Sequence, residues 1–298
     1  MNSIKLIKFD VEEFSNQLCN LNNIKVLSIK SKQFTLAQVY AVEVIHELTD
    51  SANLPLVVAA IDLTTNERSE YAVKLNASER MLPHGRMFEL IGAFMAIELE
   101  LSVVVPVVVN VSEDFVDLQK GKDYFLRCSK SFGYNYGSGY IKGLLILDNQ
   151  IALTAKQKEM GQEILAFDML IGNVDRNAEK PNMITDGNML LLLDHEAAFA
   201  FFRAMPWDKN SEPWNFNELD KGVLLKHCLF KRIKGNIGML DGFCEKMTRF
   251  DADFWDRAKT IIPEEWFCED SFSTIKAHID LIVENRVQFI QNIKILLS

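Results

Sequence analysis

The sequence of 298 residues is poor in cysteine and has no cysteines at metal-binding spacing. Its five cysteines form no C-x-x-C pair, and an odd number cannot all pair with one another. These features exclude a disulfide framework and a typical zinc site. They indicate buried or inert thiols in a reducing compartment, so we expect a cytoplasmic protein.

A long uninterrupted hydrophobic run is also missing. The first ten residues contain two lysines and no apolar stretch long enough for an export signal. The longest apolar region, residues 90–111, contains Glu98, Glu100 and Pro106. Because each charge near the middle of a membrane span costs about 2.5–3.5 kcal/mol on insertion scales, the sequence predicts no membrane helix.

Positive charge is in deficit, since 32 Lys and Arg residues stand against 41 Asp and Glu residues and the net charge is -9. Such a chain lacks the basic surface that binds the nucleic-acid backbone, so we expect no direct nucleic-acid binding. Hydrophobic residues make up 48% and charged residues 24% of the sequence, the ordinary balance of a globular protein. This balance excludes a disordered, collagen-like or coiled-coil chain.

The first part of the chain has short runs rich in Val, Ile and Tyr, separated by Asn and Ser clusters that are typical of turns. A helix is predicted over residues 86–101, where Leu, Met, Ala and Glu dominate. Pro106 lies inside the last apolar run and indicates an edge strand or a bulge. The predicted strands cover residues 24–29, 38–46, 56–62, 70–75 and 103–111.

The rest of the chain is predicted to be mainly helical. Residues 134–139 (Y-N-Y-G-S-G) resemble a turn before a strand at residues 139–147. Thr154 is the predicted N-cap of the next helix and Gly172 its stop. The D-G pair at residues 186–187, between two apolar runs, indicates a hairpin. The predicted helices cover residues 156–171, 216–232, 241–262 and 273–297.

This order of elements predicts an α+β fold with two lobes. Residues 1–114 would form a sheet-rich N-terminal lobe, and residues 115–298 a mainly helical C-terminal lobe with the catalytic and metal loops. The alternative is a single α+β domain without a cleft. A groove between Lys74 and Asp194 distinguishes the two architectures.

Polar residues follow directly after an apolar helix and after an apolar strand. The runs are N-V-D-R at residues 173–176, then P-N, then L-D-H at residues 193–195. Because the hairpin folds the chain back, Asp175, Asn182 and Asp194 can converge. Their carboxylate and amide oxygens are ligands suited to Mg²⁺, and phosphoryl transfer needs such a set. The alternative is a surface loop with an Asp–Arg pair and a capping aspartate.

Lys74 lies in Y-A-V-K-L at residues 71–75, similar to the V-A-I-K pattern that places an ammonium group beside nucleotide phosphates. A strand with one outward lysine is the alternative. The order of lysine strand, glutamate helix, Asp-containing loop and strand-end Asp is the kinase order. Glu89 and Glu98 are both candidate partners of Lys74, and sequence periodicity does not choose between them.

Together these runs resemble the HipA-like kinase family, bacterial relatives of the HipA toxin kinases. The resemblance rests on F-D-M-L-I-G-N-V-D-R at residues 167–176, P-N-M-I at residues 181–184 and L-L-D-H-E-A-A-F at residues 192–199. It extends from about Tyr71 to the end of the chain. The first 70 residues contribute no specific motif to it.

The resemblance implies a two-lobed, protein-kinase-like fold that uses ATP and Mg²⁺. It implies that Lys74 anchors the nucleotide phosphates, and it favours Glu89 as the partner of Lys74. Asp175 would be the catalytic aspartate, and Arg176 would order its loop. The metal ligands would be Asn182 and Asp194, and His195 follows the metal aspartate.

The expected activity is transfer of the γ-phosphoryl group of ATP to a Ser or Thr hydroxyl of a protein substrate. Two departures from the family pattern favour the alternative of a pseudokinase that binds nucleotide or a partner. Lys180 stands five positions after Asp175, where the family usually has asparagine, and the expected nucleotide-covering loop at residues 28–35 has no glycine. A small-molecule kinase is a further alternative.

Overall fold

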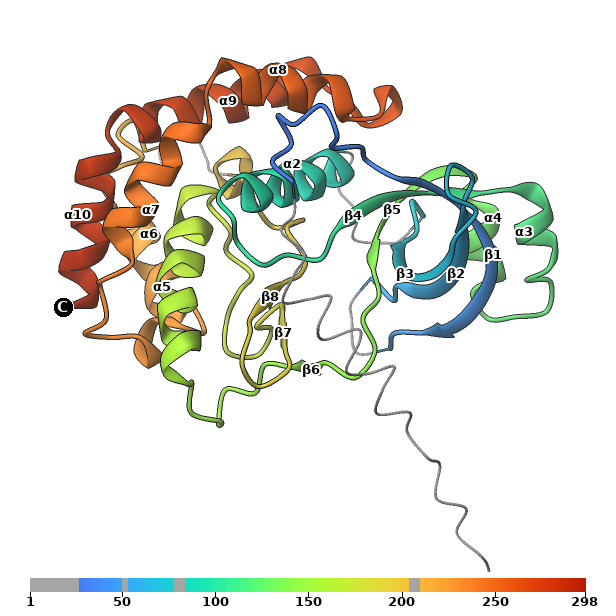
Figure 1. Ribbon diagram of the computed structural model, residues 1–298, viewed down its shortest axis with the longest axis horizontal. Coiled ribbons are helices and arrows are strands. Elements are labelled where there is room, and N and C mark those ends of the chain that lie inside the picture. Colours follow the sequence, from blue (N-terminus) through green and yellow to red (C-terminus); the bar gives the residue numbers. More distant parts are fainter. Residues whose placement is uncertain (1–26, 50–52, 78–83, 204–209) are drawn as a thin grey trace, which may run out of the picture.

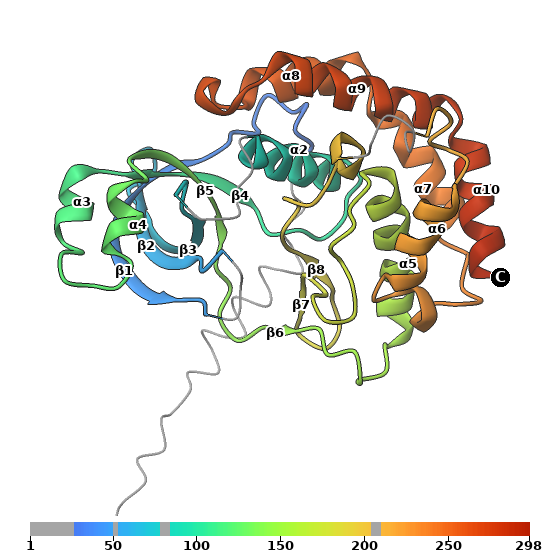
Figure 2. The same ribbon diagram turned by 180° about the vertical axis from the view of Figure 1, so that it is seen from behind.

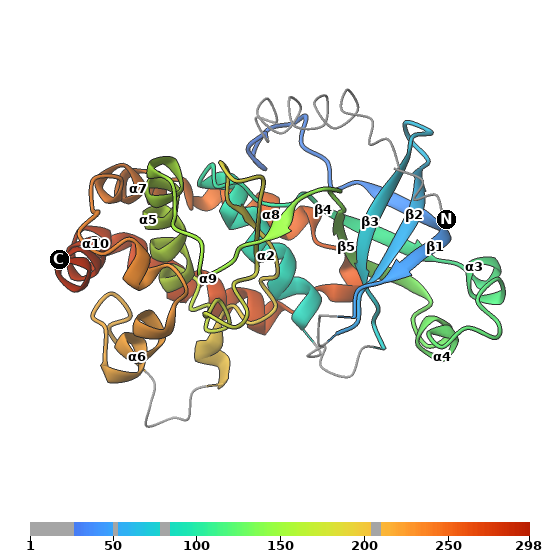
Figure 3. The same ribbon diagram turned by 90° about the horizontal axis from the view of Figure 1, so that it is seen from below.

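The computed structural model describes residues 27–49, 53–77, 84–203 and 210–298. Strands dominate its first half and helices its second half, which confirms the predicted α+β class (Figure 1). The strand-rich part lies at one end of the molecule and the C-terminal helices at the other, as Figure 3 shows from below. In the described part of the chain, no helix is long and apolar enough to cross a membrane.

Five strands form a small closed barrel in the order β1-β2-β3-β5-β4. Neighbouring strands are antiparallel, except that β1 and β4 close the barrel in parallel. Buried apolar side chains of the strands, among them Val39, Val58 and Val109, pack together in one core cluster. The strands are β1 (Gln38–Glu47), β2 (Leu56–Asp62), β3 (Arg68–Lys74), β4 (Pro106–Val111) and β5 (Gly133–Gly139).

The first three barrel strands match their predicted ranges to within two residues. The last predicted strand of the first part begins at Pro106, not at residue 103. Strand β4 as a whole pairs on both sides and has no bulge, but Pro106 itself pairs only with Ser138 of β5, because the pairing with β1 begins at Val108. As the first residue of its strand, it can lack an N–H without breaking the ladder.

The predicted turn at residues 134–139 is wrong, because this segment is strand β5. Of its glycines, Gly137 allows close strand packing, since a Cβ there would lie 2.6 Å from Val109 Cγ2. Of the strand predicted at residues 139–147, only β6 (Leu145–Ile146) forms. The strand predicted at residues 24–29 lies partly outside the described residues, and residues 27–29 are not in a strand.

A second, three-stranded sheet consists of β6, β7 (Met183–Thr185) and β8 (Leu191–Leu192). It lies between the barrel and the C-terminal helices (Figures 1 and 2). Strands β7 and β8 are antiparallel and joined through Gly187 at a φ of 91°, which confirms the predicted hairpin.

Helix α2 (Gly85–Glu98) follows β3 and is buried along almost its whole length. Its side chains belong to the larger apolar core, which it shares with the C-terminal helices. Helix α5 (Ala155–Leu170) begins with a capping box between Thr154 and Gln157 and ends before Gly172, which has a φ of 59°. Both predicted boundaries of α5 are thereby confirmed.

The long helices predicted near the C-terminus are divided into shorter ones. Asp251 accepts a hydrogen bond from the N–H of Phe254 and begins α8, while Pro263 follows its end. Two short helices between β4 and β5 were not predicted. These are α3 (Glu113–Asp117) and α4 (Phe125–Ser129); the C-terminal helices are α6 (Glu218–Lys226), α7 (Leu240–Lys246), α8 (Ala252–Ile261), α9 (Glu269–Glu284) and α10 (Arg286–Leu297).

Candidate active site

A pocket of about 500 Å³ lies between the barrel and the small sheet. Its size falls within the range of about 300–1,000 Å³ that is usual for small-molecule sites. Lys74 at the end of β3, Glu89 on α2 and Asp194 after β8 all line it. Lys74 and Asp194 therefore line one pocket, at the position where the sequence predicts a groove. Pockets of about 800 and 810 Å³ lie elsewhere, and neither is lined by these residues.

The ammonium group of Lys74 is surrounded by three carboxylates. Its Nζ lies 3.0 Å from Glu89 Oε2, 2.9 Å from Asp194 Oδ1 and 3.2 Å from Glu196 Oε2. Burial disfavours the charged lysine, but the neighbouring carboxylates outweigh it and hold the pKa of Lys74 well above its ordinary value. Because the ammonium already occupies the space between the three carboxylates, we interpret them as an ion-pair cluster and not as a metal cage.

The structure brings Glu89, and not Glu98, to Lys74. Glu98 lies near the other end of α2 and accepts a hydrogen bond of 2.7 Å from Ser28 Oγ. Burial raises the pKa of Glu89 to about 7, although the charge of Lys74 opposes this shift. The pKa of Asp194 is lowered despite its burial, because Lys74 and Lys180 stabilise the charged carboxylate.

Helix α2 approaches the segment after β8 closely, and this approach places Glu89. A Cβ at Gly92 would lie only 2.6 Å from the Cβ of His195, so the contact requires glycine. The backbone N–H of His195 donates a 3.1 Å hydrogen bond to Glu89 Oε1. His195 itself is 1% exposed, and burial lowers its pKa to about 3. It is therefore neutral at physiological pH.

Asp175 follows the turn at the end of α5 and is about 29% exposed. Its carboxylate contacts the ammonium of Lys180, with a distance of 2.5 Å from Lys180 Nζ to Asp175 Oδ2. The side chain of Asn173 accepts a 3.2 Å hydrogen bond from the N–H of Asp175. An accessible carboxylate on a braced loop can orient an incoming hydroxyl and accept its proton.

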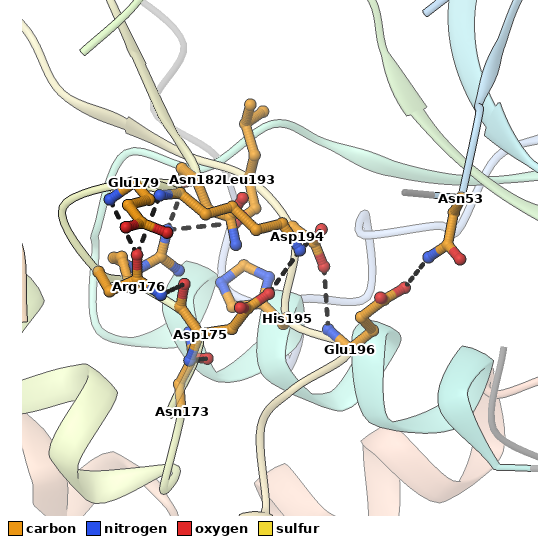
Figure 4. Close-up of polar contacts among 12 residues, drawn as sticks. Asn53, Asn173, Asp175, Arg176, Glu179, Asn182, Leu193, Asp194, His195 and Glu196 are labelled. Atoms are coloured by element: carbon orange, nitrogen blue, oxygen red, sulfur yellow. Dashed lines mark hydrogen bonds and ion pairs between the residues drawn. The ribbon is translucent and has the colours of Figure 1, made fainter. Parts of the chain in front are cut away.

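Arg176 is fully buried and connects the two loops of the site. Its Nε lies 2.6 Å from Asp168 Oδ2, and its Nη1 donates to the carbonyl oxygen of Leu193 at 3.2 Å and to that of Asn182. Figure 4 shows the Arg176 loop beside the segment that holds Leu193 and Asp194. This arrangement fits the predicted role of Arg176 in ordering the loop, and it places Asp168 as a brace.

Buried Asp168 completes this connection from α5. Burial alone would raise its pKa, but Arg176, a 2.9 Å contact with His227 Nε2 and a 2.9 Å hydrogen bond from Asn173 Nδ2 lower the pKa to about 2. The carboxylate is therefore charged at neutral pH and fixes both the Arg176 guanidinium and the Asn173 amide.

Asn182 precedes β7 and Asp194 follows β8, so both lie at the same end of this antiparallel strand pair. Both have positive φ angles, 47° and 55°, a conformation that Asn and Asp adopt more readily than most residues. The Nδ2 of Asn182 is buried and has no hydrogen-bond partner among the described residues. A buried N–H donor without a partner is consistent with a ligand that offers an acceptor atom at this position.

Sequence reasoning missed Glu196, which contacts Lys74 and accepts a 2.7 Å hydrogen bond from Asn53 Nδ2. The available signal was a carboxylate two positions after Asp194. The expected nucleotide-covering loop at residues 28–35 was wrong. Its carbonyls bind Arg257 of α8, and none of its residues lines the 500 Å³ pocket. The pocket is instead bordered by the β1–β2 connection, through Glu47, Leu48, Thr49 and Pro55.

Comparison with models of protein families gives a match. The model of the family described as HipA-like kinase matches residues 42–212, which is more than half of the chain. This range includes β3, α2 and both loops of the candidate site. A search of the curated proteins finds no match.

Proposed function

Because the chain belongs to the HipA-like kinase family, we propose that it is a phosphotransferase that uses ATP and Mg²⁺. The acceptor would be a Ser or Thr hydroxyl of a protein. In a two-lobed kinase-like fold the nucleotide would bind between the N-terminal lobe, expected at residues 1–114, and the C-terminal lobe, expected at residues 115–298. The N-terminal lobe would also have to include β5 (Gly133–Gly139), because this strand belongs to the barrel. The observation that supports this most is the buried Lys74–Glu89 pair facing Asp194 in one pocket.

Lys74 and Glu89 would bind and position the nucleotide. An ammonium held by a buried carboxylate has a fixed direction, so it can anchor phosphate oxygens without ordering itself at the moment of binding. The barrel strand sets the position of Lys74, and the Gly92–His195 contact sets that of Glu89. The role proposed for Glu89 is therefore orientation of Lys74, and that of Lys74 is contact with the phosphates.

Asp175 would orient the acceptor hydroxyl and take its proton. The new bond forms between the acceptor oxygen and the γ-phosphorus, while the bond from that phosphorus to the bridging oxygen breaks and its electron pair leaves with ADP. Arg176 would act through the backbone, because its contacts go to Asp168 and to the carbonyls of Asn182 and Leu193.

The donor set beside Asp175 fits magnesium. Asp194 Oδ1 is engaged by Lys74, while Asp194 Oδ2 has only a 3.6 Å ion pair with Lys180 among the described residues. Asp194 Oδ2 and the Asn182 amide oxygen are hard ligands, so these two residues would hold the ion. When bound, it would supply neutralisation of phosphate charge.

A second candidate function is that of a nucleotide-binding pseudokinase. The ion pair between Lys180 and Asp175 favours it, because the ammonium occupies the carboxylate that would otherwise meet the acceptor hydroxyl. The β1–β2 connection, residues 48–55, also lacks the glycines that let a loop approach phosphates closely. Nucleotide binding without transfer to any acceptor would support this candidate.

The test is incubation with γ-labelled ATP, Mg²⁺ and cell lysate, followed by identification of the labelled species. Asp175→Asn should bind ATP almost normally and lose transfer by about 10²–10⁴-fold. Asp194→Ala should lose both metal-dependent ATP binding and transfer. Lys74→Ala should weaken both to an intermediate degree.

The matched control is Asp256→Asn, which removes an exposed carboxylate on α8. Calorimetric titration with ATP and Mg²⁺ separates binding from transfer for each variant. Unchanged binding and transfer in all three site variants, equal to the control, would refute the site assignment. Labelling of metabolites but not of protein would identify a small-molecule kinase.

A further inference from the structure

Lys180 lies where its ammonium can reach both acidic residues of the proposed reaction. Its Nζ is 2.5 Å from Asp175 Oδ2 and 3.6 Å from Asp194 Oδ2. The backbone of Lys180 is fixed, since its N–H donates to Asn177 Oδ1 at 3.0 Å and its carbonyl accepts from the Asn177 N–H at 3.1 Å. About 36% of its side chain is exposed, so the ammonium can move while the backbone stays in place.

A lysine at this position changes the number of metal ions that the site can hold. An ammonium has three donors and no acceptor, so it cannot bind a metal ion. Kinases that use two magnesium ions hold them with the strand-end aspartate and an amide of the catalytic loop. In the proposed site Asp194 Oδ2 and the Asn182 amide oxygen would hold one ion, and Lys180 places a positive charge 3.6 Å from Asp194 Oδ2 in place of a further ligand.

We propose that Lys180 is the second cation of a one-metal site and binds the γ-phosphoryl group during transfer. This inference rests on the proposed function. Lys180 would leave Asp175 when the γ-phosphate enters, because that group offers several charged oxygens within reach of the same Nζ. Asp175 would then be free to take the proton of the acceptor hydroxyl, while Lys180 keeps its own protons throughout.

In the competing role, which we call a lock, the ammonium of Lys180 stays paired with the Asp175 carboxylate and inhibits transfer. The two roles predict opposite effects when the ammonium is removed. A lock predicts faster transfer without it, whereas a γ-phosphate contact predicts slower transfer and a selective loss of ATP affinity relative to ADP. ADP lacks the γ-phosphate, so its affinity should change little.

The experiment counts Mn²⁺ ions by electron paramagnetic resonance in the complex with a non-hydrolysable ATP analogue. The unmodified protein should hold one Mn²⁺ per bound nucleotide, and Lys180→Asn should hold two. Lys180→Met should still hold one Mn²⁺ ion. In this variant the affinity for the ATP analogue, relative to the affinity for ADP, should be lowered about tenfold. Lys231→Met, which removes an exposed lysine, should leave the count and the ratio unchanged.

Two bound Mn²⁺ ions in the unmodified protein would overturn the inference, as would faster transfer in Lys180→Met. Either result leaves the proposed function intact, because nucleotide still binds. Failure of the unmodified protein to bind nucleotide at all would overturn both proposals. Thermal unfolding of each variant reports whether Lys180→Asn and Lys180→Met are folded, so a lost signal is not mistaken for a lost site.

Discussion

The buried pair of Asp168 and Arg176 allows a quantitative prediction about how the site is held together. Asp168 is 1% exposed and the Arg176 side chain is fully buried, with Nε and Oδ2 only 2.6 Å apart. Asp168→Asn keeps the shape of the side chain but leaves a buried guanidinium without a counter-charge. Removing one partner of such a pair costs about 3–5 kcal/mol.

The expected loss of unfolding free energy can be expressed as a decrease in the melting temperature, Tm. For a chain of 298 residues, unfolding entropies correspond to roughly 1.6 °C per kcal/mol, so Tm should fall by about 5–8 °C. The hydrogen bonds from Asn173 and His227 to Asp168 are also weakened, which places the expectation in the upper half of that range. Transfer should fall too, because Arg176 fixes the backbone beside Asp194.

Thermal and urea unfolding at pH 7 measure this loss, with Asp256→Asn as the control for removing one carboxylate. A loss below about 1 kcal/mol for Asp168→Asn would mean that Arg176 is not buried as described.

A second comparison of the two proteins measures their stability as a function of pH. Because the folded pKa of Asp168 is about 2, its stabilisation is present above its ordinary pKa and is lost as pH falls towards 2. Asp168→Asn should lack this part of the acid sensitivity.

Two further predictions concern the contact between α2 and the segment after β8. Gly92→Ala should lower the free energy of unfolding by about 1–3 kcal/mol. It should lower the free energy of ATP binding by more, because a Cβ there would push Glu89 away from Lys74. Calorimetry and unfolding of the same variant measure the two losses, and unchanged ATP affinity would contradict the prediction. The pKa of His195 is about 3 in the folded protein, below its value in the unfolded chain. At pH values under about 6.5 the unfolded chain therefore binds one more proton than the folded protein. The free energy of unfolding then decreases as the pH is lowered, by about 1.4 kcal/mol per pH unit. His195→Gln should reduce that slope, and an equal slope in both proteins would show that His195 is not buried and neutral.

Local signals in the sequence were sufficient where the structure depends on neighbouring residues. Helix α5 begins and ends as predicted, since Thr154 and Gln157 form the capping box and Gly172 takes the positive φ that ends the helix. The hairpin through Gly187 likewise follows from its own turn. The same hairpin made the convergence of Asp175 with Asp194 predictable.

Strand β5 and the Glu89 pairing depend instead on contacts between distant segments. The glycines of β5 resemble a turn, but Gly137 is needed because Val109 of β4 lies against it inside a narrow barrel. Periodicity of α2 showed two glutamates and could not choose between them. The choice depends on Gly92 meeting His195, more than a hundred positions away, which nothing in either local segment encodes.

The charges of the pocket indicate why nucleotide and metal would bind together. The four carboxylates of the charged cluster at the pocket outnumber its two ammonium groups by two. The pKa of Glu89 is raised to about 7, because burial makes its negative charge costly there. A polyphosphate alone would add more negative charge, so its binding requires an accompanying cation. That cation would in turn favour the charged form of the neighbouring carboxylates and lower the pKa of Glu89, strengthening its hold on Lys74. The groups of the cluster are Glu89, Asp175, Asp194, Glu196, Lys74 and Lys180.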